Sequence, residues 1–307
     1  MSRKVVEIAG KSLALSNLDK DLYPAYGFTK AQILEYYRRM ARFILPHLQD
    51  RALTLKRYPE GVDQDFFFEK RCPVHHPAWV KTAQVRLEHK EPMTVCLAND
   101  LPTLMWVANL AALELHVPLA RVASPETPDA MVFDLDPTEP AGILDCARVA
   151  LILRDLLSPL GLVGYVKTSG QKGLHVYVPL NREETSFVDT KKFSKAVAEI
   201  MQKNYPDLVT AKMAKENRQG RVFINWEQND HAKTMVCVYS LRARKEPMVS
   251  FPLAWRELEN FITVGRESEA HPAISLQVIH SEAVRRVEKQ GDLFREVLET
   301  RQKLPHL

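Results

Sequence analysis

The sequence has no apolar run long enough to cross a membrane and no leader-like start. Its longest apolar stretch covers residues 101–113, whereas a membrane-spanning helix needs about 20 residues. Residues 1–7, Met-Ser-Arg-Lys-Val-Val-Glu, lack the apolar core of a signal peptide. We therefore expect no membrane contact and a cytoplasmic location.

Cysteine is scarce. The four cysteines are Cys72, Cys96, Cys146 and Cys237. None of them forms a Cys-x-x-Cys pair, so we expect neither a disulfide framework nor a four-cysteine zinc site. Cys72 precedes His75 and His76 at a faintly metal-like spacing, but no second ligand pair follows at the spacing of a zinc finger. A surface loop is the favoured interpretation.

The signature of disorder, which is low hydrophobicity with a strong net charge, is also absent. Of the 307 residues, 46% are hydrophobic and 26% are charged, with a net charge of +4, so a sizeable core is expected. The charge is uneven: residues 1–90 contain 16 Lys or Arg and 10 Asp or Glu, whereas residues 91–307 contain 26 and 28. The first third is therefore the better candidate for a polyanion-binding surface, and the remainder for an acidic site.

Hydrophobic periodicity predicts a mixture of helices and strands. Helices are expected over 30–48, 102–115, 141–158, 187–203 and 281–302, and strands over 52–58, 131–136, 162–168, 174–180, 221–226 and 234–240. Residues 1–16 alternate like a hairpin, Thr29 is a helix N-cap, and residues 59–79 form a long loop that contains three phenylalanines. Antiparallel neighbours joined by tight loops favour an α+β fold, with mixed or antiparallel sheets flanked by helices. We expect one domain over 1–307, with a small N-terminal part (1–125) packed on a catalytic part (126–307).

Two aspartates end an apolar strand in Val132-Phe133-Asp134-Leu135-Asp136-Pro137. Residues i and i+2 of a strand project from one face, so Asp134 and Asp136 are expected side by side. Adjacent carboxylates raise one another's pKa unless cations lie between them, and divalent metal ions meet that need. A solvated turn is the alternative, because Asp and Pro both favour loops.

A glycine-rich connection joins two predicted strands. It reads Thr168-Ser169-Gly170-Gln171-Lys172-Gly173-Leu174-His175. Exposed backbone N–H groups in such a connection can hold a triphosphate, with Lys172 adding positive charge. It is not a P-loop, because that motif's spacing is absent and a strand follows instead of a helix. An ordinary hairpin turn is the alternative.

Polar residues also end two later strands. Asn225 and Glu227 are expected on one face at the end of the strand over 221–226. Arg242 follows the strand over 234–240, where its guanidinium can reach a phosphate.

The basic first third combines positive charge with aromatic residues. Its lysines and arginine, followed by two rings, are Lys20, Lys30, Lys56, Arg57, Phe67 and Phe68. Single-stranded DNA ends need positive charge for their phosphates and rings for unstacked bases. Solvated lysines and buried phenylalanines are the alternative for each of these residues taken alone.

Seven short motifs occur in a fixed order along the chain. They are Leu18-Asp19-Lys20 with Leu22-Tyr23-Pro24 and Thr29-Lys30, Lys56-Arg57-Tyr58-Pro59-Glu60-Gly61, Phe67-Phe68-Glu69-Lys70, Glu114-Leu115-His116, Phe133-Asp134-Leu135-Asp136-Pro137, Ser169-Gly170-x-Lys172-Gly173-Leu174-His175 and Trp226-x-Gln228-Asn229. Together they resemble the polymerase domain of bacterial DNA ligase D, a member of the archaeo-eukaryotic primase superfamily. The resemblance runs from about residue 10 to about residue 260, and it implies a primase-like fold and a role in non-homologous end joining.

The resemblance also implies roles for individual residues. Asp134 and Asp136 match two metal-binding aspartates, which use two Mn²⁺ or Mg²⁺ ions. The positions matched to nucleotide binding are Ser169, Gly170, Lys172, Gly173, His175, Arg218, Gln228 and Arg242. His116 matches an active-site histidine near the sugar or the metal.

DNA-binding roles follow in the same way. Lys20 and Lys30 match residues that recognise the downstream 5′-phosphate at a gap. Phe67 and Phe68 match aromatic residues near the templating base. Lys56 matches a template contact, and its neighbour Arg57 is assigned to the DNA-binding set.

One position departs from the family. The family pattern is Asp-Trp-x-Gln-Asn, in which the aspartate is the third metal-binding carboxylate, but this chain has Asn225 there. An amide offers a metal one neutral oxygen and no charge, so the metal that activates the primer 3′-hydroxyl should bind more weakly. Glu227 is a candidate substitute from the same strand face.

We therefore interpret the chain as a primase-like DNA-directed DNA/RNA polymerase that adds nucleotides, preferably ribonucleotides, at double-strand breaks and gaps. The expected partners are DNA ends with a 5′-phosphate, NTP or dNTP, Ku and a DNA ligase module, in a nucleoid-associated location. A catalytically weak DNA-end and nucleotide-binding module is the alternative, and a metal-dependent phosphohydrolase is a third. The Lys-x-Asp-Gly motif of nucleotidyl ligases is absent, so the chain should not seal nicks.

Overall fold

The computed structural model describes residues 3–86, 91–182, 184–267 and 275–305. Their contacts divide the chain into two compact units. Unit 1 consists of Met1–Ala123, Thr234–Ser250 and Ile279–Asp292, and unit 2 of Ser124–Lys233, Phe251–Val278 and Leu293–Leu307. The chain first passes from unit 1 to unit 2 between Ala123 and Ser124, next to the boundary expected at 125/126. Two later segments of the expected catalytic part belong to unit 1.

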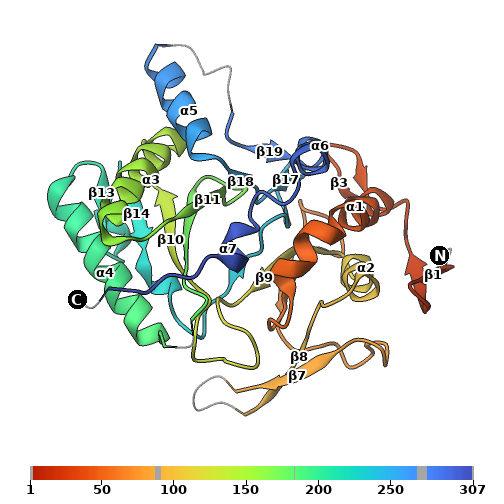
Figure 1. Ribbon diagram of the computed structural model, residues 1–307. Helices are drawn as coiled ribbons and strands as arrows, with labels where there is room; N and C mark the ends of the chain where they lie inside the picture. Colours follow the sequence, from red (N-terminus) through yellow and green to blue (C-terminus); the bar gives the residue numbers. More distant parts are fainter. Residues whose placement is uncertain (1–2, 87–90, 183, 268–274, 306–307) are drawn as a thin grey trace. The chain divides into compact units, whose positions relative to one another are not determined.

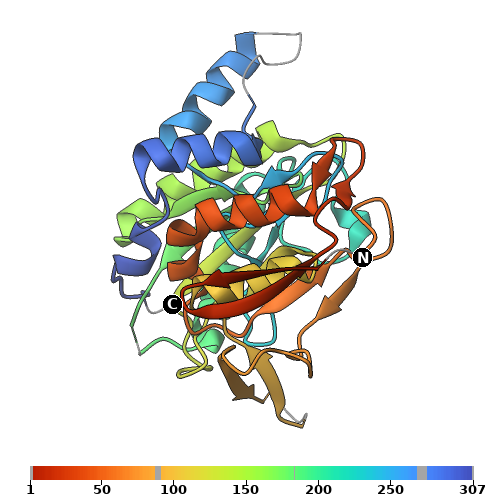
Figure 2. The same cartoon turned by 90° about the vertical axis from the view of Figure 1, so that its right-hand side faces the viewer.

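Unit 1 begins with the predicted hairpin. Strands β1 (Arg3–Ile8) and β2 (Lys11–Ser16) pair antiparallel, and the side chains of Leu13 and Leu15 are buried. The amide of Asn109 donates to the carbonyl of Ala14, and its side-chain oxygen accepts the N–H of Ser16. These bonds attach the hairpin to helix α2 (Leu101–Asn109), and Figure 2 shows the hairpin as the dark red pair of strands.

The long helix of unit 1 lies where the sequence predicts it. Helix α1 (Lys30–Leu48) begins after Thr29, whose hydroxyl accepts the N–H of Gln32 while the Gln32 side chain accepts the N–H of Thr29. This reciprocal capping satisfies backbone donors that a helix start leaves unpaired. The apolar face of α1 buries Ile33, Tyr37 and Ile44.

The helix predicted over 102–115 is wrong in its second half. Helix α2 ends at Asn109, Ala111 adopts a left-handed φ of 57°, and residues Ala112–Val117 form strand β9. The run is apolar and buried throughout, and periodicity cannot distinguish a buried helix from a buried strand. The correction moves His116 from a helix end to a strand.

Strand β9 belongs to a four-stranded sheet in the order β15-β9-β5-β6. Its other strands are β15 (Met235–Val236), β5 (Thr54–Arg57) and β6 (Phe67–Glu69). Strand β6 lies within the loop expected over 59–79, and β15 is shorter than the strand expected over 234–240. The small strands elsewhere are β3 (Asp21–Tyr23), β4 (Phe28–Thr29), β16 (Leu241–Arg242), β17 (Met248–Val249) and β19 (Val278–Ile279).

The expectation of no disulfide is wrong for one pair. Cys72 and Cys96 form a disulfide with a Cα–Cα distance of 4.9 Å, while Cys146 and Cys237 are buried thiols. Cys96 ends strand β8 (Met93–Cys96), which pairs with β7 (Thr82–Val85). The N–H of Cys72 donates to the carbonyl of Thr94, so backbone pairing brings the distant cysteines together.

Unit 2 is built on a six-stranded sheet in the order β13-β14-β10-β12-β11-β18. The strands are β10 (Ala130–Pro137), β11 (Tyr165–Thr168), β12 (Leu174–Pro179), β13 (Val209–Thr210), β14 (Val222–Asn225) and β18 (Pro252–Leu253). All neighbours pair antiparallel except β13 with β14. This mixed sheet confirms the predicted α+β class.

The sheet of unit 2 has one apolar face and one polar face. Alternate residues such as Phe133, Leu135 and Val176 enter a continuous core with helices α3 (Ile143–Leu157), α4 (Phe187–Asn204) and α5 (Trp255–Glu267) (Figure 1). The intervening residues therefore project from the opposite face. That face carries Asp134 and Asp136, together with His175, which lies opposite Asp134 in the register.

The helix predicted over 281–302 is interrupted. Helix α6 (His280–Gln290) ends at Gly291, whose φ of 80° lies outside the helical range, and a separate short helix α7 covers Glu296–Glu299. Three short 3₁₀ turns, η1 (Ser158–Leu160), η2 (Lys215–Asn217) and η3 (Trp226–Gln228), complete the elements. Among the described residues, none of these helices combines the length and apolarity that a bilayer crossing requires.

Candidate active site

Two carboxylates lie on the polar face of β10, as the spacing predicts. Asp134 lies opposite His175 on β12 and Asn225 on β14. The Nε2 atom of His175 is 3.5 Å from Oδ1 of Asp134, and Nζ of Lys172 is 3.4 Å from Oδ1 of Asp136. The structure therefore gathers Asp134, Asp136, Lys172, His175 and Asn225 around the centre of the unit 2 sheet.

Asp134 has a pKa well above that of an ordinary aspartate. Its pKa is raised to about 6, first by burial and then by the charge of Asp136, while hydrogen bonds from Asn225 and Gln228 and the charge of Lys167 oppose the rise. A carboxyl whose pKa is raised in this way gains most from a nearby positive charge.

The third expected ligand position holds an amide that faces Asp134. Nδ2 of Asn225 donates to Oδ2 of Asp134 at 3.2 Å. Asn229 anchors this segment, because its buried side chain bonds both the N–H and the carbonyl of Val132 on β10. The expected shared strand face of Asn225 and Glu227 is wrong: β14 ends at Asn225, and Glu227 lies in the 3₁₀ turn η3.

The side chains around Asp134 suit a divalent cation that is held by two carboxylates, because the third expected ligand position carries an amide. Asp134 and Asp136 supply two negatively charged oxygen donors on one face, which suits Mn²⁺ or Mg²⁺. Within the described residues, no set of three or more His, Cys, Asp or Glu side chains is arranged to hold a metal ion. The Gln228 side chain hydrogen-bonds Asp134, and its buried Oε1 has no hydrogen-bond partner within the described part of the chain, so this neutral oxygen is available to a ligand.

The glycine-rich connection approaches the carboxylates very closely. A Cβ atom on Gly173 would lie 2.1 Å from the carbonyl oxygen of Leu135, so only glycine fits there. Gly170 has a φ of 68°, which favours glycine. The expected exposed amides are wrong for two positions, because the N–H groups of Gln171 and Gly173 both donate to Oγ of Ser169 at 3.1 Å. Ser169 thus shapes the turn, and Lys172 remains its charged group.

Lys167 is a functional candidate that the sequence analysis missed. It has 0% exposure, and its Nζ lies 2.9 Å from Nδ1 of His175. Because an ammonium group only donates, Nδ1 of His175 accepts and Nε2 carries the proton that faces Asp134. The available signal was a lysine in an apolar strand, two residues before Ser169.

Two further side chains of unit 2, those of Arg218 and Gln277, contact elements that carry the site. An N–H of the Arg218 guanidinium donates to the carbonyl of Met213, and the guanidinium carbon lies 3.7 Å from the ring centre of Phe223. Phe223 on β14 is the register partner of Asp136 on β10. Gln277 donates to the carbonyl of Gln171 at 2.9 Å and so supports the glycine-rich turn from a segment 106 residues away. Sequence spacing contains no signal for that second contact.

Unit 1 holds the remaining predicted site residues in three groups. In the first, His116, Lys56 and Arg242 surround Glu114, at 2.9 Å, 3.8 Å and 3.6 Å between charged or ring atoms. Burial lowers the pKa of His116 below its ordinary value, although Glu114 opposes the shift. His116 is therefore neutral at pH 7.

The second group contains the predicted phosphate-binding lysines. Nζ of Lys20 is 2.6 Å from Oε2 of Glu60, and Lys30 is buried with Nζ 3.5 Å from Oγ of Ser16. Burial, together with the positive charges of Lys20 and Arg57, lowers the pKa of Lys30 to about 8. This clustering of positive charge suits an anionic ligand.

Three adjacent rings are exposed beside Lys56. Phe66, Phe67 and Phe68 have 48%, 44% and 56% exposure, which excludes the buried alternative. Nζ of Lys56 lies 4.0 Å from the ring centre of Phe66. Arg57 forms an ion pair with Glu69 at 2.9 Å and donates to the carbonyl of Leu110. Its guanidinium is therefore less available for DNA binding than the ammonium group of Lys56.

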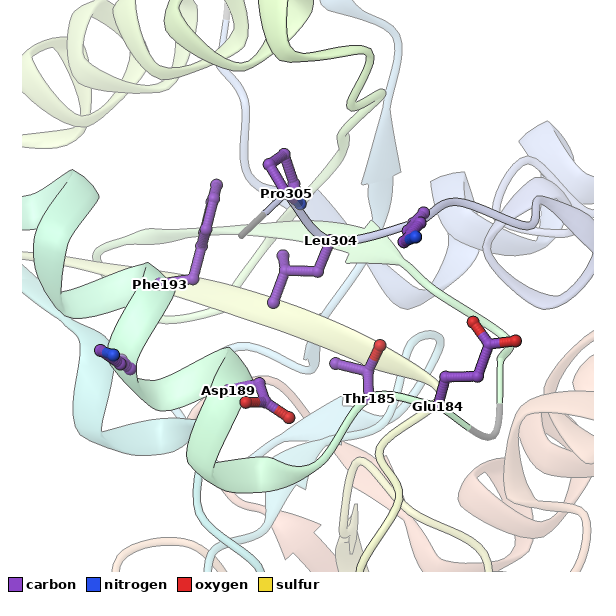
Figure 3. A pocket seen from close by; sticks show the side chains of 8 residues that line it. Glu184, Thr185, Asp189, Phe193, Leu304 and Pro305 are labelled. Carbon is purple, nitrogen blue, oxygen red and sulfur yellow. The ribbon is translucent and has the colours of Figure 1, made fainter. Parts of the chain in front are cut away.

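A separate pocket of about 300 Å³ in unit 2 contains none of the predicted site residues. Figure 3 shows Asp189 and Phe193 of α4 on one side and Leu304 and Pro305 on the other. Asp189 caps its own helix through Ser186. The lining mixes acidic, basic and apolar groups, so it has no clear preference for one kind of ligand.

Comparison with known proteins identifies the family. The family model "LigD, primase-polymerase domain" matches residues 29–294. The chain belongs to this family. The LigD primase-polymerase domain described here is 40% identical over 291 residues to the "Multifunctional non-homologous end joining DNA repair protein LigD" of Mycobacterium tuberculosis, and 32% identical over 251 residues to the "Bifunctional non-homologous end joining protein LigD" of Bacillus subtilis.

These matches cover 92% and 82% of this chain but only 36% and 40% of the relatives. A solved structure, "Polymerase Domain from Mycobacterium tuberculosis Ligase D in complex with DNA", superposes with a TM-score of 0.85 at 38% identity, over 94% of this chain and 99% of that one. The predicted primase-like fold and the family resemblance are therefore confirmed for this LigD primase-polymerase domain.

Proposed function

We propose that the chain is a DNA-directed nucleotidyltransferase that extends 3′ ends at breaks and gaps during non-homologous end joining. The observation that carries the proposal is the pair of carboxylates, Asp134 and Asp136, with Lys172 of the glycine-rich turn 3.4 Å from Asp136. Negative groups for metal and a positive group for phosphate thus lie side by side, which phosphoryl transfer requires. Membership of the LigD family supports the same activity.

Asp134 and Asp136 would hold two Mn²⁺ or Mg²⁺ ions, with Asn225 as a neutral third donor. When bound, such ions neutralise phosphate charge and lower the pKa of an attacking hydroxyl. The chain's own residues position the reactants. Lys172 neutralises the triphosphate, and His175 presents its Nε2–H to an oxygen acceptor. The primer 3′-hydroxyl then attacks the α-phosphorus, and pyrophosphate leaves.

DNA binding would fall to the basic first third of the chain. Lys20 and Lys30 suit a 5′-phosphate, and the exposed rings of Phe67 and Phe68 suit unstacked bases. A solved relative of this chain, the polymerase domain from Mycobacterium tuberculosis ligase D, is in complex with DNA, which supports this assignment. We propose a DNA ligase module as a partner because the chain covers only part of its longer LigD relatives, and Ku because the names of these relatives refer to non-homologous end joining.

Asn225 favours a second possibility, a weak polymerase that mainly binds DNA ends and nucleotides. An amide brings no charge to the metals, so transfer would be slow while binding survives. Primer extension on a gapped duplex separates the two. We expect template-directed addition that needs Mn²⁺ or Mg²⁺ and that is faster with ribonucleotides than with deoxynucleotides. Nucleotide and gap binding without any extension would support the binding module and contradict the polymerase.

A further inference from the structure

Glu114 is buried at the centre of three side chains that have proposed ligand-binding roles. It lies in β9 with 0% exposure. Its Oε2 is 2.9 Å from Nε2 of His116, and its Oε1 is 3.6 Å from Nε of Arg242 and 3.8 Å from Nζ of Lys56. The backbone N–H of Ala243 also donates to Oε1 at 3.1 Å. One carboxylate thus contacts residues from β5, β9 and β16.

The charge of Glu114 is maintained despite its burial. Burial opposes ionisation, but the hydrogen bond from His116 and the positive charges of Arg242 and Lys56 outweigh it and lower the pKa to about 2. An ionised carboxylate only accepts hydrogen bonds, so Nε2 of His116 must carry a proton and donate it. Glu114 therefore sets the tautomer and the orientation of His116.

Arg242 and Lys56 depend on the same carboxylate. Nε of Arg242 is buried and has no hydrogen-bond partner among the described residues, and Oε1 of Glu114, 3.6 Å away, supplies a neighbouring negative charge. Lys56 otherwise faces the rings of Phe66 and Tyr58, which attract a cation but do not fix its direction. Removing the charge of Glu114 would leave two buried or half-buried cations without an anion.

We propose that Glu114 is a positioning residue that orients His116, Arg242 and Lys56 together, so that one buried carboxylate couples a template contact to two nucleotide contacts. The proposal rests on the proposed function of those three side chains. Glu114 itself would touch neither nucleotide nor DNA, because its oxygens are occupied and it has no exposed surface.

The kinetic test compares Glu114→Gln with Glu35→Gln, an exposed control whose partner Arg38 lies in the same helix. We expect Glu114→Gln to raise the nucleotide KM about tenfold, to change kcat less than threefold and to weaken binding of a gapped duplex as well, because Lys56 loses its anion. A KM within twofold of the control would overturn the proposal. Glu114→Asp keeps the charge but shortens the reach, so it should keep the parent's Tm and still raise KM. Parent-like kinetics in that variant would count equally against the coupling.

A second measurement does not depend on turnover. The ¹⁵N resonances of the His116 ring should report an Nε2–H tautomer in the parent and a mixed or altered state in Glu114→Gln. Unchanged ring resonances would refute the positioning role even in an active enzyme. If instead the parent fails to extend primers but its His116 signals respond to Glu114→Gln, the proposed function fails while the contact network stands.

Discussion

The side-chain amide of Asn225 donates a hydrogen bond to Oδ2 of Asp134 at 3.2 Å, across directly paired positions of β14 and β10. A carboxylate at this position could not donate that bond and would repel Asp134. Asn225 thus favours the ionised form of Asp134 without any metal, and it adds no negative charge that would attract one. We therefore expect the same side chain to stabilise the metal-free site and to weaken metal binding.

Replacing Asn225 with aspartate should therefore increase the rate of primer extension. We expect a gain of roughly tenfold or more, the scale on which a positioned catalytic group acts. Single-turnover extension at saturating Mn²⁺ is the measurement, and nucleotide affinity should change little because Ser169 and Lys172 are untouched. Rates that agree within about twofold would show that position 225 is not a metal-ligand position.

A control for Asn225→Asp uses stability instead of activity. Without metal, three neighbouring carboxylates repel, so the Tm should fall below that of the parent. Added Mn²⁺ binds only the folded site, so it should raise the Tm of the variant more than that of the parent. An equal response in the two proteins would contradict a gain in metal affinity.

Alanine at Asp134 or Asp136 should abolish metal-dependent extension. These side chains are the negative groups that we propose as metal ligands, and their removal leaves the proposed DNA-binding lysines of unit 1 unchanged. Extension assays combined with gapped-DNA binding provide the test. Either variant extending a primer as well as the parent would refute the metal role.

Alanine at both Lys20 and Lys30 should reduce affinity for a 5′-phosphorylated gap much more than for the same gap with a 5′-hydroxyl. The two lysines are close enough for the charge of one to lower the pKa of the other, which suits a doubly charged phosphate. Fluorescence anisotropy on the two substrates measures the difference. Equal losses would make both lysines general backbone contacts.

The preference for a 5′-phosphate should also depend on pH through Lys30. Burial lowers its pKa to about 8, helped by Lys20 and Arg57, so Lys30 is charged below that pH and becomes neutral above it. Bound phosphate favours the charged form. The affinity ratio of phosphorylated to unphosphorylated gap should therefore fall between pH 7 and pH 9.5, by roughly tenfold if phosphate raises the pKa by about one unit. Lys30→Arg, which stays charged, should remove this dependence, and the same slope in that variant would implicate another group.

Replacing Lys167 with methionine should weaken nucleotide binding through His175. Loss of the donor at Nδ1 frees the ring to change tautomer, and removal of a partner that orients a functional histidine costs on the order of tenfold. Nucleotide titration of Lys167→Met measures the effect. His175→Ala provides the control: once the ring is absent, adding Lys167→Met should weaken binding little further, whereas additive losses would show that Lys167 acts independently.

Local sequence patterns were sufficient wherever the determining interactions lie within one element. The capping pair Thr29 and Gln32 starts α1 at the predicted residue, because both partners are three residues apart. Asp134 and Asp136 share a face because side chains alternate along any strand. The motifs also predicted the family and its α+β fold, since their residues lie close together in the chain.

Long-range contacts decided what the sequence could not show. The disulfide between Cys72 and Cys96, the support of the glycine-rich turn by Gln277 and the placement of Arg242 beside Glu114 join residues 24, 106 and 128 positions apart. Spacing contains no signal for such pairs, because they form only when separate strands align. For the same reason the buried residues Ala112–Val117 form a strand and not a helix. Their partners in β5 and β15 supply backbone hydrogen bonds that no local pattern specifies.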